Sequence, residues 1–590
     1  MKKLSTIVLN VLLLAILLPS MIFSQDRGEV IVVPPVYEGS AFGVLNRFIM
    51  GDTIAGGERA HPNAIYRLQR GQYYEVNSKM VIDFNITIDA EAETNPASPT
   101  RPPMIIVGKD DQGNKINPIF DFIGDSTYIE FKGVIINAFD PTGPLTEQPG
   151  RWGMYFYGAF HRFSMDSCIV LGYEAAVTNP RATDRCSYFY TNNIFYNNLW
   201  IHGVGGGGVM SNTVKTAYND SVVIVNNTFF NMGGNVFLDW EFVDYYEYSH
   251  NTMYNTSING LWLPNFTNAK FNDNLFVDYQ TVGETEWEYH SGHWDKGTPR
   301  HGHASILKLN LCDPQILADH RMEESDRKVE AKNNVYYWSE TLRDYWENET
   351  SQKDINMGNT GEIYPTTWIN SMTDSMFKSL GDYQYPHLVQ ENNENLDPGF
   401  DAQMVSDVLA KEIPFVQEYR KYGWTTLNDA VERYYYKDGT GAELFNVPWP
   451  LNWSLAYTNE AVLTHAQGGF PAGDLNWFPD KKAEWEEWVS DIEIENNYNN
   501  NMPRNYNLSQ NYPNPFNPTT EINFSIPKSG LTSLEVYNLL GQKVATLVNK
   551  QLAAGSYKYK FDGSNLASGV YFYKLQANDY AKVKKMMLMK

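Results

Sequence analysis

The stretch VNNTFFNMGGNVFLDWEF, Val225–Phe242, contains the pattern that decides the fold, which is two adjacent asparagines followed by an apolar or aromatic run. Related versions occur as TNNIFYNN from Thr191, SHNTMYNT from Ser249, NDNLFVD from Asn272 and KNNVYYW from Lys332. A pattern that returns this often along one chain indicates a structural unit stacked on copies of itself.

The spacing between copies gives the length of the unit. Successive second asparagines are 34, 24, 23 and 60 residues apart, at Asn193, Asn227, Asn251, Asn274 and Asn334. Further back, Ser167 and Gly133 take the place of this asparagine in the pattern. The shortest spacing predicts one coil of about two dozen residues, and the longer spacings predict coils that carry insertions.

Within each unit, short apolar runs such as NVFLDW from Asn235 and GLWLPN from Gly260 lie at nearly the same offset. Strands this short, broken by Gly and Asn turns, exclude helical periodicity. A repeat of this length with several short strands is typical of a parallel β-helix. An asparagine at a tight bend tolerates left-handed backbone geometry, and identical bends on successive coils let the amides form a ladder. We therefore expect the asparagines to be structural.

The repeat region resembles the right-handed parallel β-helix proteins of the pectate-lyase-like superfamily. The resemblance rests on the entry YRLQRGQYYEV, the middle STYIEFKGVII and the exit NLDPGF at Asn395, and it covers roughly residues 55–400. It implies an all-β, right-handed parallel β-helix solenoid, to which we assign residues 25–400. Because unrelated activities share such folds, the resemblance specifies the fold better than the activity.

The repeat stops near Asp401, and residues 401–500 predict a mixed segment of helix and aromatic loop. DAQMVSDVLAKEIPFVQEYRKYG and KKAEWEEWVSDIEIE have apolar residues at helical spacing, and NVPWPLNWSLAYTN between them is aromatic loop sequence. We expect this segment to pack along the solenoid or to cap it. The polar stretch NNYNNNMPRN then predicts a linker.

Residues 505–590 predict a small immunoglobulin-like β-sandwich, because strands alternate with Gly turns. YPNPFNP from Tyr512, VYNLLGQKV from Val536, LAAGSYKYKFDGSNLASGVYFYKL from Leu552 and the basic end KVKKMMLMK occur in order. Together they closely resemble the C-terminal sorting domain of proteins exported by the type IX secretion system. The resemblance implies transport by that machinery across the outer membrane of Bacteroidota-like bacteria. The exported protein is then released or held on the cell surface.

The first 24 residues predict a secretory signal peptide, with Lys2 and Lys3 before an apolar run and small residues near Ser24. No later run is long and apolar enough to span a membrane, so the mature protein is expected to be exported and soluble. The chain has three cysteines, Cys168, Cys186 and Cys312. At most one disulfide can form, and Cys168 and Cys186 are the pair nearest in sequence. Because a long stacked fold does not need a disulfide for stability, we expect three buried thiols.

The net charge limits the classes of molecule that the protein can bind. The whole chain carries −23, its last 86 residues carry +6 and the leader carries +2, which leaves −31 for residues 26–504. A body this acidic is repelled by nucleic acid and by anionic membrane surfaces. Nucleic acid is therefore excluded as a partner.

Four carboxylates lie within nine residues of LDWEFVDYYEY, at Asp239, Glu241, Asp244 and Glu247. On one strand, Asp239 and Glu241 would share a face with their Cα atoms ~6.6 Å apart. Two carboxylates at that range can serve as acid and base in glycoside hydrolysis, or the cluster can take part in a calcium site. The alternative is a solvated acidic rim.

Four of the eleven histidines lie in EYHSGHWDKGTPRHGHA, at His290, His293, His301 and His303. This segment is the long insertion between the coils of Asn274 and Asn334, and such insertions often line a binding groove. The histidines can gather a transition metal, although their spacing fits no familiar motif and loop histidines are often plain surface residues.

Polysaccharide lyases of the superfamily that the chain resembles use a basic residue near the uronate and neutralise its carboxylate with calcium or arginine, which eases proton abstraction. Arg181, Arg185 and His202 lie on neighbouring coils and are the candidates for lyase chemistry. The charge of −31 disfavours a polyanionic substrate unless calcium bridges it.

Aromatic residues make up 14% of the chain, and four tryptophans lie near both candidate clusters: Trp240, Trp262, Trp287 and Trp294. Exposed rings on a flat β face are platforms for sugar stacking. Aromatic side chains also fill solenoid interiors, which is the structural alternative.

The leading hypothesis is a secreted β-helix that binds polysaccharide; cleavage, if present, would be lyase or glycoside hydrolase chemistry. The main alternative is a non-catalytic surface adhesin or scaffold. A third interpretation makes the carboxylates a structural calcium site.

Overall fold

The computed structural model describes residues 28–589 except 37–42, 56, 111, 115, 140–150, 200–207, 213–217, 240–241, 259, 263–264, 286–287, 289–304, 310, 320–321, 382–383, 423–446, 501–506, 509, 512, 527–529, 553–554 and 578–579. Two compact units divide the chain, and their boundary lies between Lys482 and Ala483. Each unit is described by itself.

The first unit is a parallel β-helix whose coils contribute strands to three faces, here called A, B and C. Face A contains β4 (Met80–Ile82), β7 (Phe120–Phe122), β10 (Trp152–Ala159), the first part of β13 (Ala176–Thr191), β15 (Gly208–Asn212), β18 (Phe237–Asp239) and β21 (Leu261–Trp262). Face B contains β1 (Val30–Val33), β2 (Ile65–Leu68), β5 (Ile86–Ala90), β8 (Tyr128–Lys132), β11 (Arg162–Asp166), the second part of β13, β16 (Tyr218–Val225), β19 (Phe242–Ser249), β22 (Phe266–Asn272), β26 (Lys328–Lys332) and β30 (Leu388–Glu391). Face C contains β3 (Tyr73–Val76), β6 (Met104–Val107), β9 (Ile135–Asn137), β12 (Ile169–Leu171), β14 (Ile194–Tyr196), β17 (Thr228–Met232), β20 (Thr252–Thr256), β23 (Leu275–Tyr279), β27 (Val335–Tyr337) and β31 (Glu394–Asn395).

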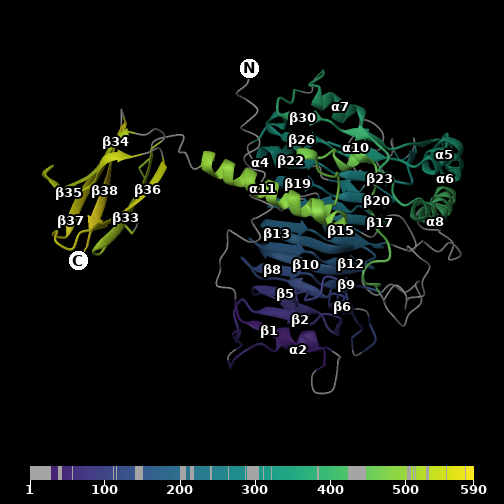
Figure 1. Ribbon diagram of the computed structural model, residues 1–590, viewed down its shortest axis with the longest axis horizontal. Coiled ribbons are helices and arrows are strands. Elements are labelled where there is room, and N and C mark those ends of the chain that lie inside the picture. Colours follow the sequence, from purple (N-terminus) through teal and green to yellow (C-terminus); the bar gives the residue numbers. More distant parts are fainter. Residues whose placement is uncertain are drawn as a thin grey trace. The chain divides into compact units, whose positions relative to one another are not determined.

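Each strand pairs in parallel with its counterpart on the next coil, as in Thr228 opposite Thr252 and Thr252 opposite Leu275. Figure 1 shows the coils stacked from the purple strands β1 and β2 to the teal strands β26 and β30. The identical register places like side chains above one another inside the solenoid. Phe195 and Phe229, for example, stack with ring centroids 5.4 Å apart and planes 7° apart. This all-β architecture confirms the predicted solenoid.

The paired asparagines divide two tasks between them. The first residue of each pair has a left-handed backbone, with φ of 59° at Asn192 and at Asn226. The second donates from Nδ2 to the Oδ1 of its counterpart on the next coil, at 2.9, 3.0, 3.2, 2.9 and 2.7 Å along Asn193, Asn227, Asn251, Asn274, Asn334 and Asn393. The predicted asparagine ladder is therefore present, and it fixes the bend between faces B and C.

The positions of Ser167 and Gly133 differ from the prediction by one residue. Both have positive φ, 56° and 66°, so they correspond to the first residue of the pair rather than to the ladder position. The backbone N–H of Cys168, one residue later, donates to Asn193 Oδ1 at 2.9 Å. The sequence pattern did not separate the two positions, because adjacent asparagines fill both of them in several coils.

Removal of one ladder amide is expected to destabilise the solenoid. Asn251 is fully buried, and its Nδ2 donates to the carbonyl oxygens of Ile224 and Ser249 at 2.8 and 3.0 Å besides its ladder partner. Asn251→Ala leaves these buried groups unpaired, at a cost of roughly 2–4 kcal/mol in the free energy of unfolding. Chemical denaturation measures the loss. Asn393→Ala, at the half-exposed end of the ladder, should cost clearly less, and equal losses would contradict the proposed role.

Helices lie at the ends of the solenoid and within its insertions. α2 (Val44–Met50) contacts β1 and β3 of the first coils. The insertions after β23 contain α4 (Pro314–Asp319), the 3-10 turn η2 (Glu324–Asp326), α5 (Glu340–Asn348), α6 (Gln352–Asn356) and α7 (Ser371–Phe377). Two small ladders join the insertions, β24 (Glu284–Thr285) with β28 (Ile363–Tyr364) and β25 (Ser305–Leu307) with β29 (Thr367–Ile369).

The mixed segment after the solenoid packs along its flank. It contains α8 (Ala402–Tyr422), α10 (Glu460–Leu463), the 3-10 turns η3 (Gln467–Gly469) and η4 (Leu475–Trp477), and the start of α11 (Pro479–Asn500). Trp453 of this segment contacts Phe230 and Tyr196 of face C, with ring centroids 4.8 and 5.4 Å apart. Face C therefore has an apolar outer side as well as an apolar interior. This explains the aromatic residues both in the strands of face C and in the segment that packs on them.

The second unit contains two antiparallel sheets around one core. One sheet is β32 (Asn507–Leu508), β33 (Thr519–Ile526) and β36 (Gly555–Asp562), and the other is β35 (Lys543–Leu552), β34 (Gly530–Tyr537), β37 (Gly569–Ala577) and β38 (Tyr580–Leu588). Side chains of both sheets, among them Phe524 and Tyr573, form the core. This small β domain agrees with the fold predicted for the tail.

All three cysteines are buried thiols, as expected. No helix within the described part of the chain is long and apolar enough to cross a membrane. The predicted signal peptide, residues 1–24, lies outside the described residues.

Candidate functional site

Asp239, the first carboxylate of the predicted acid–base pair, points into the solenoid. It is 2% exposed, accepts a hydrogen bond from Asn212 Nδ2 at 3.2 Å, and accepts another from the hydroxyl of the core residue Tyr246. β18 ends at Asp239, so this carboxylate lies at the bend between faces A and B rather than in the middle of an outward-facing row. Glu241 lies outside the described residues. Asp239 is therefore withdrawn from contact with an external polymer, and we leave it out of the site.

Asp244 and Glu247 both lie on β19, but their side chains have different partners. Asp244 accepts hydrogen bonds from the hydroxyl of Tyr218 and, at 3.4 Å, from that of Thr267. Glu247 is fully buried and accepts from the Tyr245 hydroxyl at 2.8 Å. The two carboxylates do not converge.

A charged pair across neighbouring strands explains how Glu247 is held. Glu247 lies opposite Lys270 in the β19–β22 ladder. Burial raises the pKa of Glu247 and lowers the pKa of Lys270 to about 8, while the attraction between the two charges opposes both shifts. Such a buried pair is a structural element of face B.

No group of three or more His, Cys, Asp or Glu side chains in the described parts of the chain is placed to hold a metal ion. The four histidines of the predicted metal set, His290, His293, His301 and His303, lie outside those parts. A calcium or transition-metal site there stays a prediction. His202 and the side chains of Trp240, Trp262, Trp287 and Trp294 are likewise outside what the structure describes, although the backbone of Trp262 pairs with Leu238 in face A.

The two predicted arginines flank the corner at which β13 passes from face A to face B. Both side chains are exposed. The Arg181 guanidinium lies over the ring of Tyr155, 4.6 Å from its centroid, and the Arg185 guanidinium lies over Tyr218 at the same distance. Arg185 also forms an ion pair with Asp220, with Nε and Oδ1 2.9 Å apart. The structure thus brings both arginines to one outer edge, each against a tyrosine.

Tyr155 belongs to a row of half-buried rings on β10, together with Trp152 and Tyr157. The Trp152 and Tyr155 centroids are 6.1 Å apart, and those of Tyr155 and Tyr157 are 6.3 Å apart. Tyr155 and Tyr157 point outward because the alternating residues Met154 and Phe156 fill the core. These rings were missed in the sequence, although the alternation in MYFYG is the signal that could have found them.

A charged pair lies beside these rings. Asp121 of β7 is the register partner of Tyr155, and its Oδ2 is 2.7 Å from Lys79 Nζ. The hydrogen bond to Asp121 raises the pKa of Lys79, and burial raises the pKa of Tyr157, so the lysine is charged and the tyrosine is neutral near pH 7. We call Lys79, Asp121, Trp152, Tyr155, Tyr157 and Arg181 the face A strip. Because Lys79 and Asp121 balance each other, Arg181 leaves the strip with a positive charge on an acidic body.

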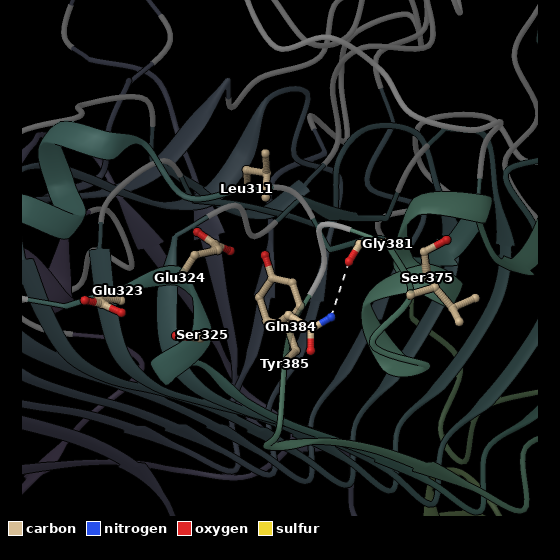
Figure 2. Close-up of a pocket in the computed structure, with 9 residues that line it drawn as sticks. Leu311, Glu323, Glu324, Ser325, Ser375, Gly381, Gln384 and Tyr385 are labelled. Atoms are coloured by element: carbon tan, nitrogen blue, oxygen red, sulfur yellow. Dashed lines mark hydrogen bonds between the residues drawn. The ribbon is translucent and has the colours of Figure 1, made fainter.

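A pocket of about 850 Å³ lies in a different part of the unit, beside η2 and α7. It is lined by Leu311, Glu323, Glu324, Ser325, Ser375, Leu380, Gly381, Gln384 and Tyr385. Figure 2 shows Glu324 next to Tyr385, with Leu311 above them and Ser375 across the pocket. None of these residues was singled out in the sequence, because they come from three segments without a repeated motif.

The comparison with known families concerns the second unit. Residues 510–589 match the secretion system C-terminal sorting domain. This match confirms the resemblance of the tail to type IX sorting domains. A domain of this kind directs the protein through that machinery to the cell surface or the extracellular space. No curated protein matches the chain.

Proposed function

We propose that this exported β-helix is a polysaccharide-binding protein whose face A strip is the binding surface. The observation that carries the proposal is the row of three adjacent aromatic rings, partly exposed on a rigid sheet, with an arginine over the central ring. The resemblance of residues 55–400 to the pectate-lyase-like superfamily agrees with a glycan ligand.

The chemistry of the strip suits a sugar chain. Pyranose rings have apolar C–H faces that pack on aromatic rings, while their hydroxyl groups need hydrogen-bond partners at the edges. Trp152 and the two tyrosines offer the ring faces. Asp121, Lys79 and Arg181 offer acceptors and donors beside them. Strands fix the backbone around the rings, so little conformational entropy is lost on binding.

Cleavage is a separate question from binding. Asp239 is buried inside the solenoid, and the other candidates for acid or base chemistry, Glu241 and His202, lie outside the described residues. The proposal is therefore limited to binding, and lyase or hydrolase activity stays a prediction. Absorbance of unsaturated uronates and release of reducing ends, followed with and without calcium, test it.

The binding surface is tested with the protein expressed without residues 1–24. Trp152→Ala combined with Tyr155→Ala should weaken binding to neutral polysaccharides at least about tenfold, which corresponds to about 1.4 kcal/mol. Affinity electrophoresis in gels that contain the polymers measures the change. The matched control is Tyr73→Ala on β3, where Arg101 lies over the tyrosine ring at 4.0 Å. The strip would be ruled out as the binding surface if only the control variant lost binding. It would also be ruled out if the polymers slowed the parent, the double variant and the control equally.

A further inference from the structure

The pocket beside η2 is separate from the face A strip. The strip lies on β7, β10 and β13, with Lys79 directly before β4. The pocket is bordered by residues before β26 and β30, among the last coils of face B. Its volume of about 850 Å³ lies within the range of roughly 300–1,000 Å³ that is usual for small-molecule sites.

A fixed carboxylate forms one wall of the pocket. Glu324 Oε2 accepts a hydrogen bond from the backbone N–H of Cys312 at 2.9 Å, and Glu324 Oε1 is 2.6 Å from Arg327 Nη1. Arg327 itself is 1% exposed and lies over the Phe266 ring at 4.3 Å. The arginine and the amide hold Glu324 in a single orientation, so the carboxylate is preorganised to accept further hydrogen bonds.

Tyr385 places a hydroxyl next to this carboxylate. The residue is 5% exposed, so mainly its pocket side is accessible. Burial, and then the charge of Glu324, raise the pKa of Tyr385, as does the hydrogen bond that its hydroxyl donates to Glu324, so the hydroxyl stays protonated and its oxygen can still accept. A carboxylate and a phenol oxygen side by side offer two acceptors to vicinal hydroxyl groups.

Other polar groups and two leucines complete the lining. Gln384 Nε2 donates to the Gly381 carbonyl at 3.3 Å, which orients the amide (Figure 2). Ser375 donates its hydroxyl hydrogen to the Ser371 carbonyl at 2.9 Å, and its oxygen can still accept. Leu311 and Leu380 are 42% and 52% exposed, which provides apolar surface at the rim.

We propose that this pocket binds a neutral sugar residue at the end of a glycan chain. Hydroxyl groups of the sugar would meet Glu324, Tyr385, Gln384 and Ser375, while its C–H face would pack on the leucines. Glu323 and Glu324 repel a carboxylate or sulfate, so uronic acids and sulfated sugars are disfavoured. The inference rests on the proposed function, because it adds an end-binding pocket to a surface that binds the length of the chain.

The test is saturation-transfer NMR on the protein without residues 1–24, with glucose, galactose, mannose, N-acetylglucosamine and galacturonate as probes. At least one neutral sugar should give saturation transfer, and galacturonate should give none. Ser375→Trp fills the pocket from the partly exposed side of α7 and should abolish the signal. Tyr385→Phe removes one hydroxyl and should weaken binding several-fold. Ser371→Trp, on the same helix and outside the lining, is the matched control and should bind like the parent protein.

The outcomes separate this inference from the proposed function. Trp152→Ala with Tyr155→Ala should leave the monosaccharide signal intact, and Ser375→Trp should leave most of the polymer binding intact. Silence of every neutral sugar, a signal that survives both Ser375→Trp and Tyr385→Phe, or equal binding of galacturonate would overturn the pocket and leave the strip standing. Loss of polymer binding only in the pocket variant would overturn the strip instead.

Discussion

Replacement of Glu288 by alanine is expected to lower the free energy of unfolding by about 3–5 kcal/mol, because it leaves a buried guanidinium without its counter-charge. Arg420 of α8 is 2% exposed, and its Nη1 lies 2.9 Å from each carboxylate oxygen of Glu288. Its Nη2 donates to the carbonyl oxygens of Val282 and Gly283 at 2.6 and 3.0 Å. This pair fastens α8 to the solenoid directly before the histidine-rich insertion.

The electrostatics of Glu288 support this expectation. Burial alone would raise its pKa, but Arg420 and Lys353 outweigh burial and hold the pKa below its usual range. The carboxylate is therefore charged in the folded protein at neutral pH, and its removal is felt as a missing charge rather than as a missing hydrogen bond.

Chemical denaturation followed by tryptophan fluorescence measures the loss. Asp374→Ala is the matched control, because Asp374 pairs with Lys378 at 2.6 Å on the surface, where an ion pair contributes about 1 kcal/mol or less. Glu288→Leu combined with Arg420→Met removes both charges and should recover most of the stability. A loss in Glu288→Ala as small as that of the control would show that Arg420 finds another partner or water.

The repeat architecture could be predicted because one local rule recurs in the later coils of the solenoid. From Asn192 on, each bend between faces B and C has a left-handed residue followed by a ladder asparagine, as Asn226 and Asn227 show. The rule is periodic, so each copy confirms the others. Where the ladder asparagine itself is replaced, as at Cys168 after Ser167, the pattern still marks the bend but was placed one position too early.

The site was harder to predict because the direction of a side chain near a bend is not a periodic property. The carboxylates of LDWEFVDYYEY look alike in sequence, yet Asp239 points into the core and Glu247 is buried against its strand neighbours. Arg181 and Arg185 were singled out as basic residues on neighbouring coils, but the structure places both on one long strand, β13, and their role stays a prediction. The pocket of Glu324 and Tyr385 needs tertiary contacts between residues 61 positions apart, which no local pattern contains.

The flanking segment contains a second large effect, which depends on pH. Asp474 is 1% exposed and docks on face C, where the Thr228 hydroxyl donates to its Oδ2 at 2.6 Å and the Asn476 N–H donates to its Oδ1 at 2.9 Å. Burial raises the pKa of Asp474 to about 7, against the hydrogen bonds and the charge of Lys482, which lower it. Between the two pKa values, the folded protein therefore keeps a proton on Asp474 that the unfolded chain has already released.

The sign of the effect follows from this difference. In the unfolded chain the carboxyl titrates near its ordinary pKa of 3.8, so the stability associated with Asp474 is fully present below pH 4 and is lost as the pH rises to about 7. The loss is on the order of 4 kcal/mol, because the two pKa values differ by about three. Asp474→Asn cannot ionise and should escape this loss. The stability of the variant relative to the parent should therefore increase from pH 4 to about 7.5 and stay level above that.

Denaturation curves of both proteins at several pH values measure this difference, and other titrating groups cancel because both proteins contain them. The amide that the substitution introduces must present its Nδ2 to Thr228, whose oxygen already accepts from Trp477 Nε1 at 2.8 Å, so a constant offset between the two proteins is expected. The offset does not depend on pH, and the slope alone decides. A difference that is flat from pH 4 to 8 would mean that Asp474 is ionised in the folded protein, with Lys482 outweighing burial at this contact.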